Sequence, residues 1–317
     1  MSEILLEARN LSRDFPAARR QSIHAVSGVS LEIREGETLG LVGESGCGKS
    51  TLGRMLMHLI RPTSGEILYR GTPVTGLSDT EFMKYRRKLQ MVFQDPYASL
   101  NPRMTVRNLI AEPLETHRIC PDREETTRRV LELMETAGLP GEYLHRYPHQ
   151  FSGGQRQRIA IARAIAPDPE LIVCDEPVSA LDVSVQNQIL NLLKRLQESR
   201  KLAYLFISHD LSVIRYISDR TAVMYLGKIC ETGSTEEIFR TPLHPYTRFL
   251  TESVPLPDPH RRGERTRLLS GEMPSPVNPP SGCRFHTRCP YATERCAREE
   301  PQLKTSGTRQ LACHLET

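Results

Sequence analysis

A short glycine-rich stretch limits what this chain can fold into more than any other feature. The nine residues Gly43 to Thr51 include three glycines, a lysine and three hydroxyl side chains. They follow an apolar run, residues 38–42, and precede a helix-like run, residues 52–59. In a strand, loop and helix of this kind, glycines let successive backbone N–H groups converge on a polyphosphate. The stretch predicts a nucleoside triphosphate site, and the alternative is a Gly/Ser loop that matches by chance.

The residues of this loop have separate expected roles. We expect Lys49 to reach the outer phosphates and the Ser50 hydroxyl to bind Mg²⁺, while the helix start adds its positive dipole end. Cys47 is either a thiol with a lowered pKa or, as we prefer, the occupant of a variable loop position. The expected nucleotide-binding residues of the loop are Gly43, Ser45, Gly46, Cys47, Gly48, Lys49, Ser50 and Thr51.

Length and composition indicate a globular protein of the cytosol. The 317 residues can hold one large or two modest domains, and 38% apolar residues suffice for a core. No run approaches the roughly 18 to 20 apolar residues that cross a bilayer, and Met1–Glu3 lacks a signal-peptide pattern. The 42 basic and 38 acidic residues give a net charge of +4, which is too small and too evenly spread to favour nucleic-acid binding.

Polar side chains follow three apolar, strand-like runs downstream of the loop, where open α/β sheets bind their ligands. They are Gln94 after residues 89–93, Asp175 and Glu176 after residues 170–174, and His209 after residues 203–207. The amide can reach Mg²⁺ or the attacking water, the aspartate can hold Mg²⁺ through water, and the glutamate can accept a proton. The histidine becomes a candidate γ-phosphate contact. The alternatives are a turn residue, a helix cap and a hydrogen-bonded structural histidine.

A second anion site is expected where Ser152 precedes a helix-like run that continues to Ile165. Its residues are Ser152, Gly153, Gly154 and Gln155. Ser152 is a plausible N-cap, and a helix start with two glycines can bind an anion, although an ordinary Ser-Gly-Gly turn has the same sequence. Two anion sites but one phosphate loop predict a dimer that sandwiches two nucleotides.

Two further segments flank this core. Residues 4–11 and 23–33 read as strands of an antiparallel lid, and Phe15 between them either stacks on adenine or serves as a buried anchor. Residues 96–151 contain repeated prolines between short helical pieces, which indicates a helical insertion and a docking surface for a partner.

The order and spacing of these motifs resemble those of the ATP-binding subunit of ABC transporters, over most of residues 3–250. Gly43 to Thr51 resembles the Walker A loop, Gln94 the Q-loop, Ser152 to Gln155 the signature motif, Leu171 to Glu176 the Walker B motif, Ser179 to Asp182 the D-loop and His209 the switch histidine. The signature has Phe151 where Leu is usual, a conservative change.

This resemblance implies a phosphate-loop NTPase core of α/β class, with an antiparallel β subdomain and a helical insertion at about 96–165. It implies catalytic roles for Glu176, His209, Gln94 and Lys49, Mg²⁺ binding through Ser50, Gln94 and Asp175, and adenine stacking by Phe15. The expected divisions are an ATPase domain at 1–254, a Pro-rich strap at 255–282 and a four-cysteine module at 283–317.

The subfamily resemblance is to the oligopeptide/dipeptide import ATPases, particularly the second, F-type subunit. It is carried by residues 93–102, 179–184 and 244–247 and by the cysteine-containing tail. It implies peptide uptake from the cytoplasmic face of a bacterial inner membrane, in a heterodimer with a second ATPase, two permeases and a periplasmic binding protein. Alternatives are a nickel, glutathione or other solute importer, a soluble ABC ATPase without a transport role, and a regulatory subunit whose partner catalyses.

The tail carries four of the eight cysteines, and a cytosolic chain argues against disulfides. They are Cys283, Cys289, Cys296 and Cys313. Inert buried thiols are one interpretation, and structural Zn²⁺ is a second, although the spacing is wider than that of usual paired ligands. The subfamily resemblance favours a [4Fe–4S] cluster on the four thiolates.

Overall fold

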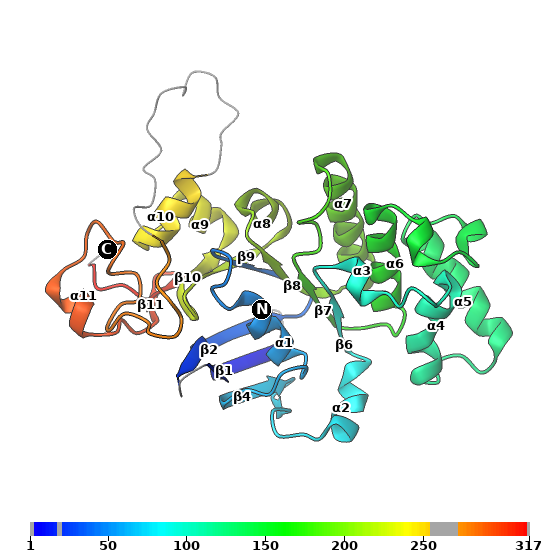
Figure 1. Ribbon diagram of the computed structural model, residues 1–317, viewed down its shortest axis with the longest axis horizontal. Helices are drawn as coiled ribbons and strands as arrows, with labels where there is room; N and C mark the ends of the chain where they lie inside the picture. Colours follow the sequence, from blue (N-terminus) through cyan, green and yellow to red (C-terminus); the bar gives the residue numbers. More distant parts are fainter. Residues whose placement is uncertain (1–2, 18–20, 254–271, 316–317) are drawn as a thin grey trace, which may run out of the picture. The chain divides into compact units, whose positions relative to one another are not determined.

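The computed structural model describes residues 3–17, 21–253 and 272–315, and the chain divides into two compact units (Figure 1). The phosphate-loop unit comprises Ile4–Ile33, Glu37–Thr75 and Phe206–Thr317. The helical unit consists mainly of Gly76–Leu205 and also includes Arg34–Gly36. Of the strap expected at 255–282, residues 255–271 lie outside the described part of the chain.

One sheet of the phosphate-loop unit has the strand order β2-β1-β4-β5. Its strands are β1 Ile4–Pro16, β2 Ser22–Arg34, β4 Ser64–Tyr69 and β5 Thr72–Pro73. β4 runs antiparallel to β1, with Leu6 opposite Tyr69. Both predicted lid strands are present but longer than expected, so Phe15 lies on β1 and not in the turn.

A second set of strands in this unit carries the phosphate loop and the end of the chain. They are β3 Thr38–Val42, β9 Arg220–Tyr225, β10 Lys228–Ser234, β11 Lys304–Ser306 and β12 Arg309–Leu311. β3 is fully buried and pairs in parallel with β9, as its unbroken apolar sequence suits. β9 and β10 form a hairpin, and β12 pairs antiparallel with β10. The tail therefore extends a sheet of the phosphate-loop unit.

The helices of this unit are short and begin at residues suited to that position. They are α1 Lys49–Leu56, α8 Leu211–Ile217, α9 Thr235–Arg240, α10 Pro245–Glu252 and α11 Glu294–Arg298. Ser234 caps α9 by accepting the Glu237 N–H at 3.3 Å. Pro245 occupies the first position of α10, where its missing N–H costs no hydrogen bond.

The helical unit contains the predicted insertion, and α4, α5 and α6 lie together in it (green in Figure 1). Its elements are α2 Asp79–Arg86, β6 Leu89–Val92, α3 Pro96–Ser99, α4 Val106–Thr116, α5 Arg123–Thr136, η2 Gly141–Tyr143, η3 Pro148–Gln150, α6 Gly153–Ile165, β7 Leu171–Asp175 and α7 Val183–Arg200. β6 and β7 are parallel, with Leu89 opposite Leu171. β8 Ala203–Ser208 crosses from this unit into the other.

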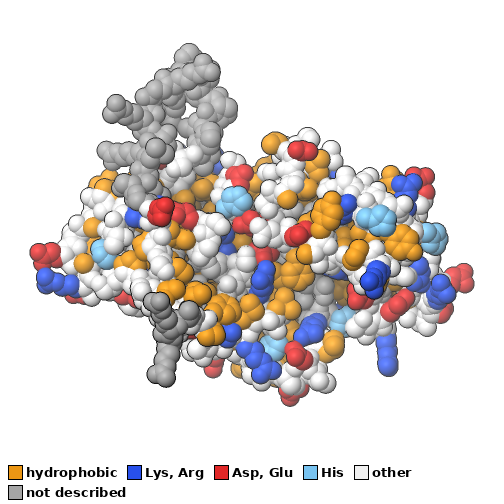
Figure 2. All heavy atoms as spheres, in the orientation of Figure 1, with side chains coloured by type: hydrophobic (Ala, Val, Ile, Leu, Met, Phe, Trp, Pro, Cys, Tyr) orange, Lys and Arg blue, Asp and Glu red, His pale blue; other side chains and the backbone are white. Residues whose placement is uncertain are grey.

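Charged side chains of both signs are interspersed on the face shown in Figure 2. In the described part of the chain, no helix has both the length and the apolar character that a bilayer span requires.

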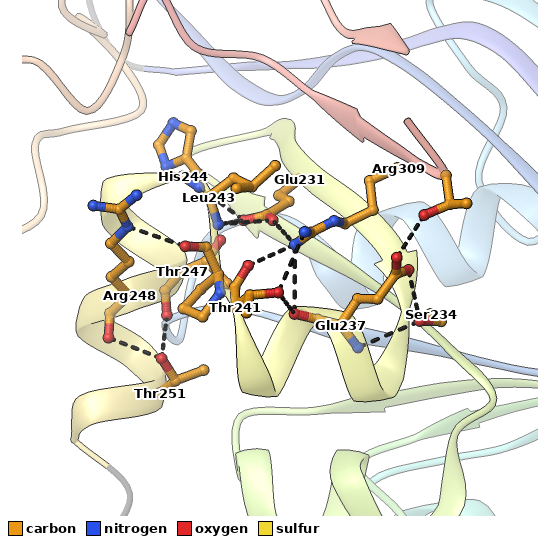
Figure 3. A network of polar contacts seen from close by, with 12 residues as sticks. Glu231, Ser234, Glu237, Thr241, Leu243, His244, Thr247, Arg248, Thr251 and Arg309 are labelled. Atoms are coloured by element: carbon orange, nitrogen blue, oxygen red, sulfur yellow. Dashed lines mark hydrogen bonds and ion pairs between the residues drawn. The ribbon is translucent and has the colours of Figure 1, made fainter. Parts of the chain in front are cut away.

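A buried carboxylate ties the tail to the rest of its unit (Figure 3). The Glu231 side chain on β10 accepts the backbone N–H groups of Leu243, at 3.0 Å, and His244, at 2.9 Å. Arg309 on β12 forms an ion pair with it at 3.5 Å and donates to the Thr241 carbonyl at 2.6 Å. One acceptor therefore holds both the α9–α10 connection and the C-terminal hairpin.

The neighbouring His244 is buried, and burial lowers its pKa to about 4. Its Nδ1 accepts the Tyr246 N–H at 3.0 Å, so the neutral ring caps α10.

Replacing Glu231 by alanine should lower the free energy of unfolding by on the order of 3 kcal/mol, because two backbone N–H groups lose their buried acceptor and the Arg309 guanidinium loses its carboxylate partner. Chemical denaturation of the full chain measures this. The matched control is Glu236→Ala, which removes an exposed ion pair with Arg240 and should leave the unfolding midpoint unchanged. Equal midpoints for both variants would contradict this role of Glu231.

Candidate functional site

The loop between β3 and α1 has, at two positions, a backbone conformation that residues other than glycine rarely adopt. Gly46 has a φ of 80° and Gly48, the N-cap of α1, a φ of 106°. A Cβ on Gly48 would lie 2.1 Å from the Ala25 carbonyl oxygen, so a side chain is excluded by space as well as by φ. Ser50 and Thr51 lie in the first turn of α1, whose backbone N–H groups have no partner within the helix. The loop and these N–H groups together can bind an anion.

Lys49 is buried within the same loop. Its Nζ donates to the carbonyl oxygens of Gly43, at 2.7 Å, and Glu44, at 3.0 Å. Cys47 is buried next to it, and burial raises the pKa of its thiol more than Lys49 lowers it. The alternative of a lowered thiol pKa is therefore wrong.

Two contacts on Glu44 were not anticipated from the sequence. Its N–H donates to the Tyr246 Oη at 2.9 Å, and its carboxylate accepts from Arg288 Nη1 at 3.0 Å. Tyr246 belongs to the run 244–247, one of the segments that carry the subfamily resemblance. That resemblance was the available sequence signal for a role of Tyr246. Arg288 had no comparable signal.

His209 and Phe15 belong to the same unit as the phosphate loop. His209 is exposed at the end of β8, and the next residue, Asp210, caps α8 by accepting the Ser212 N–H at 2.7 Å. Phe15 is half-buried on β1, and the Arg13 guanidinium lies over its ring at 4.6 Å. It is therefore not a deeply buried anchor.

In the helical unit, Gln94 and Glu176 are brought together from the ends of two strands. Gln94 Nε2 donates to Glu176 Oε2 at 3.0 Å. Glu176 has a φ of 47°, a left-handed conformation that non-glycine residues rarely adopt. Asp175, directly before it, is fully buried at the end of β7. Such a conformation persists only where the surrounding structure holds the residue in place.

The second predicted anion site forms the start of α6, also in the helical unit. Ser152 and Gln155 make a capping box: Gln155 N–H donates to Ser152 Oγ at 3.4 Å, and Ser152 N–H donates to Gln155 Oε1 at 3.1 Å. A Cβ on Gly154 would lie 2.4 Å from Val185 Cγ1, so glycine allows α7 to pack closely. Ser152 itself is exposed.

The four tail cysteines lie in one module but do not form the expected metal site. Burial raises the pKa of Cys283 to about 11, and the thiolates of Cys296, Cys313 and Cys289 add to the increase. Among residues 3–17, 21–253 and 272–315, however, no three His, Cys, Asp or Glu side chains are arranged to hold a metal ion. The predicted [4Fe–4S] cluster, and its Zn²⁺ alternative, are therefore not supported by this structure.

Two family models match the chain. The model described as ABC transporter matches residues 26–179. The model described as oligopeptide/dipeptide transporter, C-terminal region, matches residues 230–296.

Curated relatives match over nearly the whole chain. The oligopeptide transport ATP-binding protein AppF of Bacillus subtilis is 51% identical over 99% of this chain and 98% of its own length. For OppF of Escherichia coli the identity is 51%, over 92% of this chain and 88% of the relative. The di/tripeptide transport ATP-binding protein DppF of Pseudomonas aeruginosa is 49% identical over 98% of both chains.

Among solved structures, the dimeric ATP-binding cassette MJ0796 bound to ADP and Pi is similar to this chain. The TM-score is 0.67 at 33% identity, and the match covers 73% of this chain and 99% of the cassette. CbiO1 of Clostridium perfringens gives a TM-score of 0.66 at 26% identity, over 75% of this chain and 92% of the other. Sequence and fold agree: the chain is an ATPase with the ABC fold and belongs to the ATP-binding subunits of the oligopeptide/dipeptide family of ABC transporters.

Proposed function

We propose that this chain hydrolyses ATP to energise the uptake of di- and oligopeptides, from the cytoplasmic face of a bacterial inner membrane. The hydrolytic part rests on one observation, the hydrogen bond between Gln94 and Glu176 at strand ends downstream of a phosphate loop. The peptide part is supported by relatives about half identical in sequence, named for oligopeptide and di/tripeptide transport.

The proposed chemistry assigns one role to each side chain. Glu176 takes the proton of a water whose oxygen attacks the γ-phosphorus, while the bond from that phosphorus to the β,γ-bridging oxygen breaks and ADP leaves. Gln94 donates to Glu176 through Nε2, which aims the carboxylate and keeps the amide oxygen as an acceptor. Lys49 and His209 stabilise the charge that develops on the phosphoryl oxygens, and the Phe15 ring stacks on adenine.

Oxygen donors at the three predicted Mg²⁺-binding positions suit that ion. They are the hydroxyl of Ser50, the amide oxygen of Gln94 and the carboxylate of Asp175, and hard oxygen ligands are those that Mg²⁺ prefers. Bound Mg²⁺ would neutralise charge on the β- and γ-phosphates.

We also propose that the start of α6 covers the nucleotide of a second ATPase subunit. Ser152, Gly153, Gly154 and Gln155 would contact the partner's ATP in a head-to-tail heterodimer. The exposed helix start with its capping box supports this proposal, as does the dimeric form of MJ0796 with ADP and Pi. The helical insertion at 96–165 would dock on two permeases, which receive peptide from a periplasmic binding protein.

Glu176→Gln should reduce ATP turnover by the assembled subunits at least about 100-fold, because the amide cannot accept the proton. ATP binding should persist, and the closed dimer should accumulate with ATP. Turnover and binding of a fluorescent ATP analogue measure the two effects. Glu198→Gln, at an exposed position of α7, is the matched control. Unchanged turnover in Glu176→Gln, as when catalysis resides in a partner, would reject the assigned base.

Cells that lack this chain should lose uptake of labelled di- and oligopeptides, and the wild-type chain should restore it while Glu176→Gln should not. Uptake of nickel and of glutathione, measured in the same cells, tests the other importer classes. Loss of nickel or glutathione uptake with intact peptide uptake would reject the peptide assignment. No loss of any uptake would favour a soluble ABC ATPase without a transport role.

The [4Fe–4S] cluster remains a proposal, with Zn²⁺ as its alternative. The closeness of the thiols supports it: burial raises the pKa of Cys283, Cys289 and Cys313, and neighbouring cysteines add to the increase. The Leu315 N–H that donates to Cys313 Sγ at 3.5 Å also supports it. In the described arrangement the thiols would have to move to become ligands, and no step of the proposed chemistry depends on them.

Protein purified without oxygen should show visible charge-transfer absorption and roughly four irons per chain if the thiols bind the cluster. Cys296→Ser should lose this iron, and Cys120→Ser, outside the module, should keep it. Zinc in place of iron would select the alternative, and absence of both metals would reject the ligand set.

A further inference from the structure

The segment between Cys283 and Cys289 is attached directly to the phosphate-loop unit. Phe285, at its centre, is 1% exposed. Its ring centroid lies 5.2 Å from that of Tyr225 on β9 and 5.4 Å from that of Tyr246 on α10. Edge-on and tilted aromatic contacts at these distances stabilise a fixed arrangement. The segment is therefore anchored by a buried ring.

Arginines on either side of this ring contact different parts of the phosphate-loop unit. Arg284 Nη2 donates to Ser27 Oγ at 2.8 Å, and its Nη1 donates to the Leu226 carbonyl oxygen. Arg288 Nη1 donates to both Glu44 carboxylate oxygens, at 3.1 and 3.0 Å, although the two residues are 244 positions apart in the sequence. The Arg288 side chain is 7% exposed and that of Glu44 27%, so water screens this pair only partly.

Glu44 is consequently held through three of its groups. Its carbonyl oxygen accepts from Lys49 Nζ, its N–H donates to Tyr246 Oη, and its carboxylate accepts from Arg288. Tyr225 Oη also accepts from Arg288 Nη1 at 3.3 Å, so the nitrogen that contacts Glu44 has a further partner. These contacts hold Glu44 near the start of the loop, between Gly43 and Gly46.

The negative charge of Glu44 would oppose the binding of a triphosphate unless a positive charge lies beside it. A carboxylate in a phosphate-binding loop has the same sign as the triphosphate, and like charges at close range in a partly buried site oppose binding. Arg288 supplies the opposite charge and keeps the carboxylate turned toward itself. We propose that Arg288, from the C-terminal cysteine module, is a positioning residue for ATP binding that neutralises and orients Glu44 in the phosphate loop.

Arg288→Ala should raise the Kd and the KM for ATP about tenfold, the scale expected when a partly buried carboxylate loses its partner. The kcat at saturating ATP should stay within about twofold of wild type, because Arg288 does not touch the reacting atoms. Arg288→Lys keeps the charge and should recover most of the affinity. The full chain with Mg²⁺ and a fluorescent ATP analogue gives Kd, and the assembled subunits give KM and kcat.

The double variant Glu44→Gln/Arg288→Ala separates neutralisation from simple support of the fold. Removing the carboxylate removes the repulsion, so the double variant should bind ATP within about threefold of wild type. Arg295→Ala is the matched control, since Arg295 lies in the same module and pairs with exposed Glu299 at 2.7 Å. An Arg288→Ala variant that binds as Arg295→Ala does would overturn the proposal. So would a double variant that binds as weakly as Arg288→Ala, because the module would then only support the fold.

Discussion

The phosphate loop requires a backbone that points several N–H groups at one place, and a chain does not adopt this arrangement without support. Gly46 and Gly48 supply the positive φ values, and β3 and α1 fix the two ends of the loop. Lys49 turns back on the carbonyl oxygens of Gly43 and Glu44. Contacts within the chain itself therefore hold the loop in the shape of an anion cradle.

The C-terminal region contributes to this organisation although it lies far along the sequence. The hairpin β11–β12 extends a sheet of the phosphate-loop unit, and the Glu231–Arg309 pair fastens it. Phe285 and Arg288 then carry the contact to Tyr246 and Glu44. The C-terminal region is therefore part of the structure that surrounds the phosphate loop, and not a separate accessory module.

Sequence reasoning predicted those parts of the fold and site that local chemistry specifies. The loop at Gly43 to Thr51 and the cap at Ser152 each depend on neighbours within a few residues. The pairing of Glu44 with Arg288 and the left-handed φ of Glu176 depend on tertiary packing, which no local pattern records. The packing of Phe285 on Tyr225, which anchors the segment between Cys283 and Cys289, also depends on tertiary structure. The spacing of the cysteines did not reveal it.

We propose that two chains complete each active centre, one giving the phosphate loop, Glu176 and His209 and the other a signature motif. An experimental structure of this chain with its partner ATPase, Mg²⁺ and a non-hydrolysable ATP analogue tests this directly. The analogue bound to Lys49 should contact the partner's signature motif, while Ser152 should contact the partner's nucleotide. A single nucleotide gripped by both Lys49 and Ser152 of one chain would contradict it.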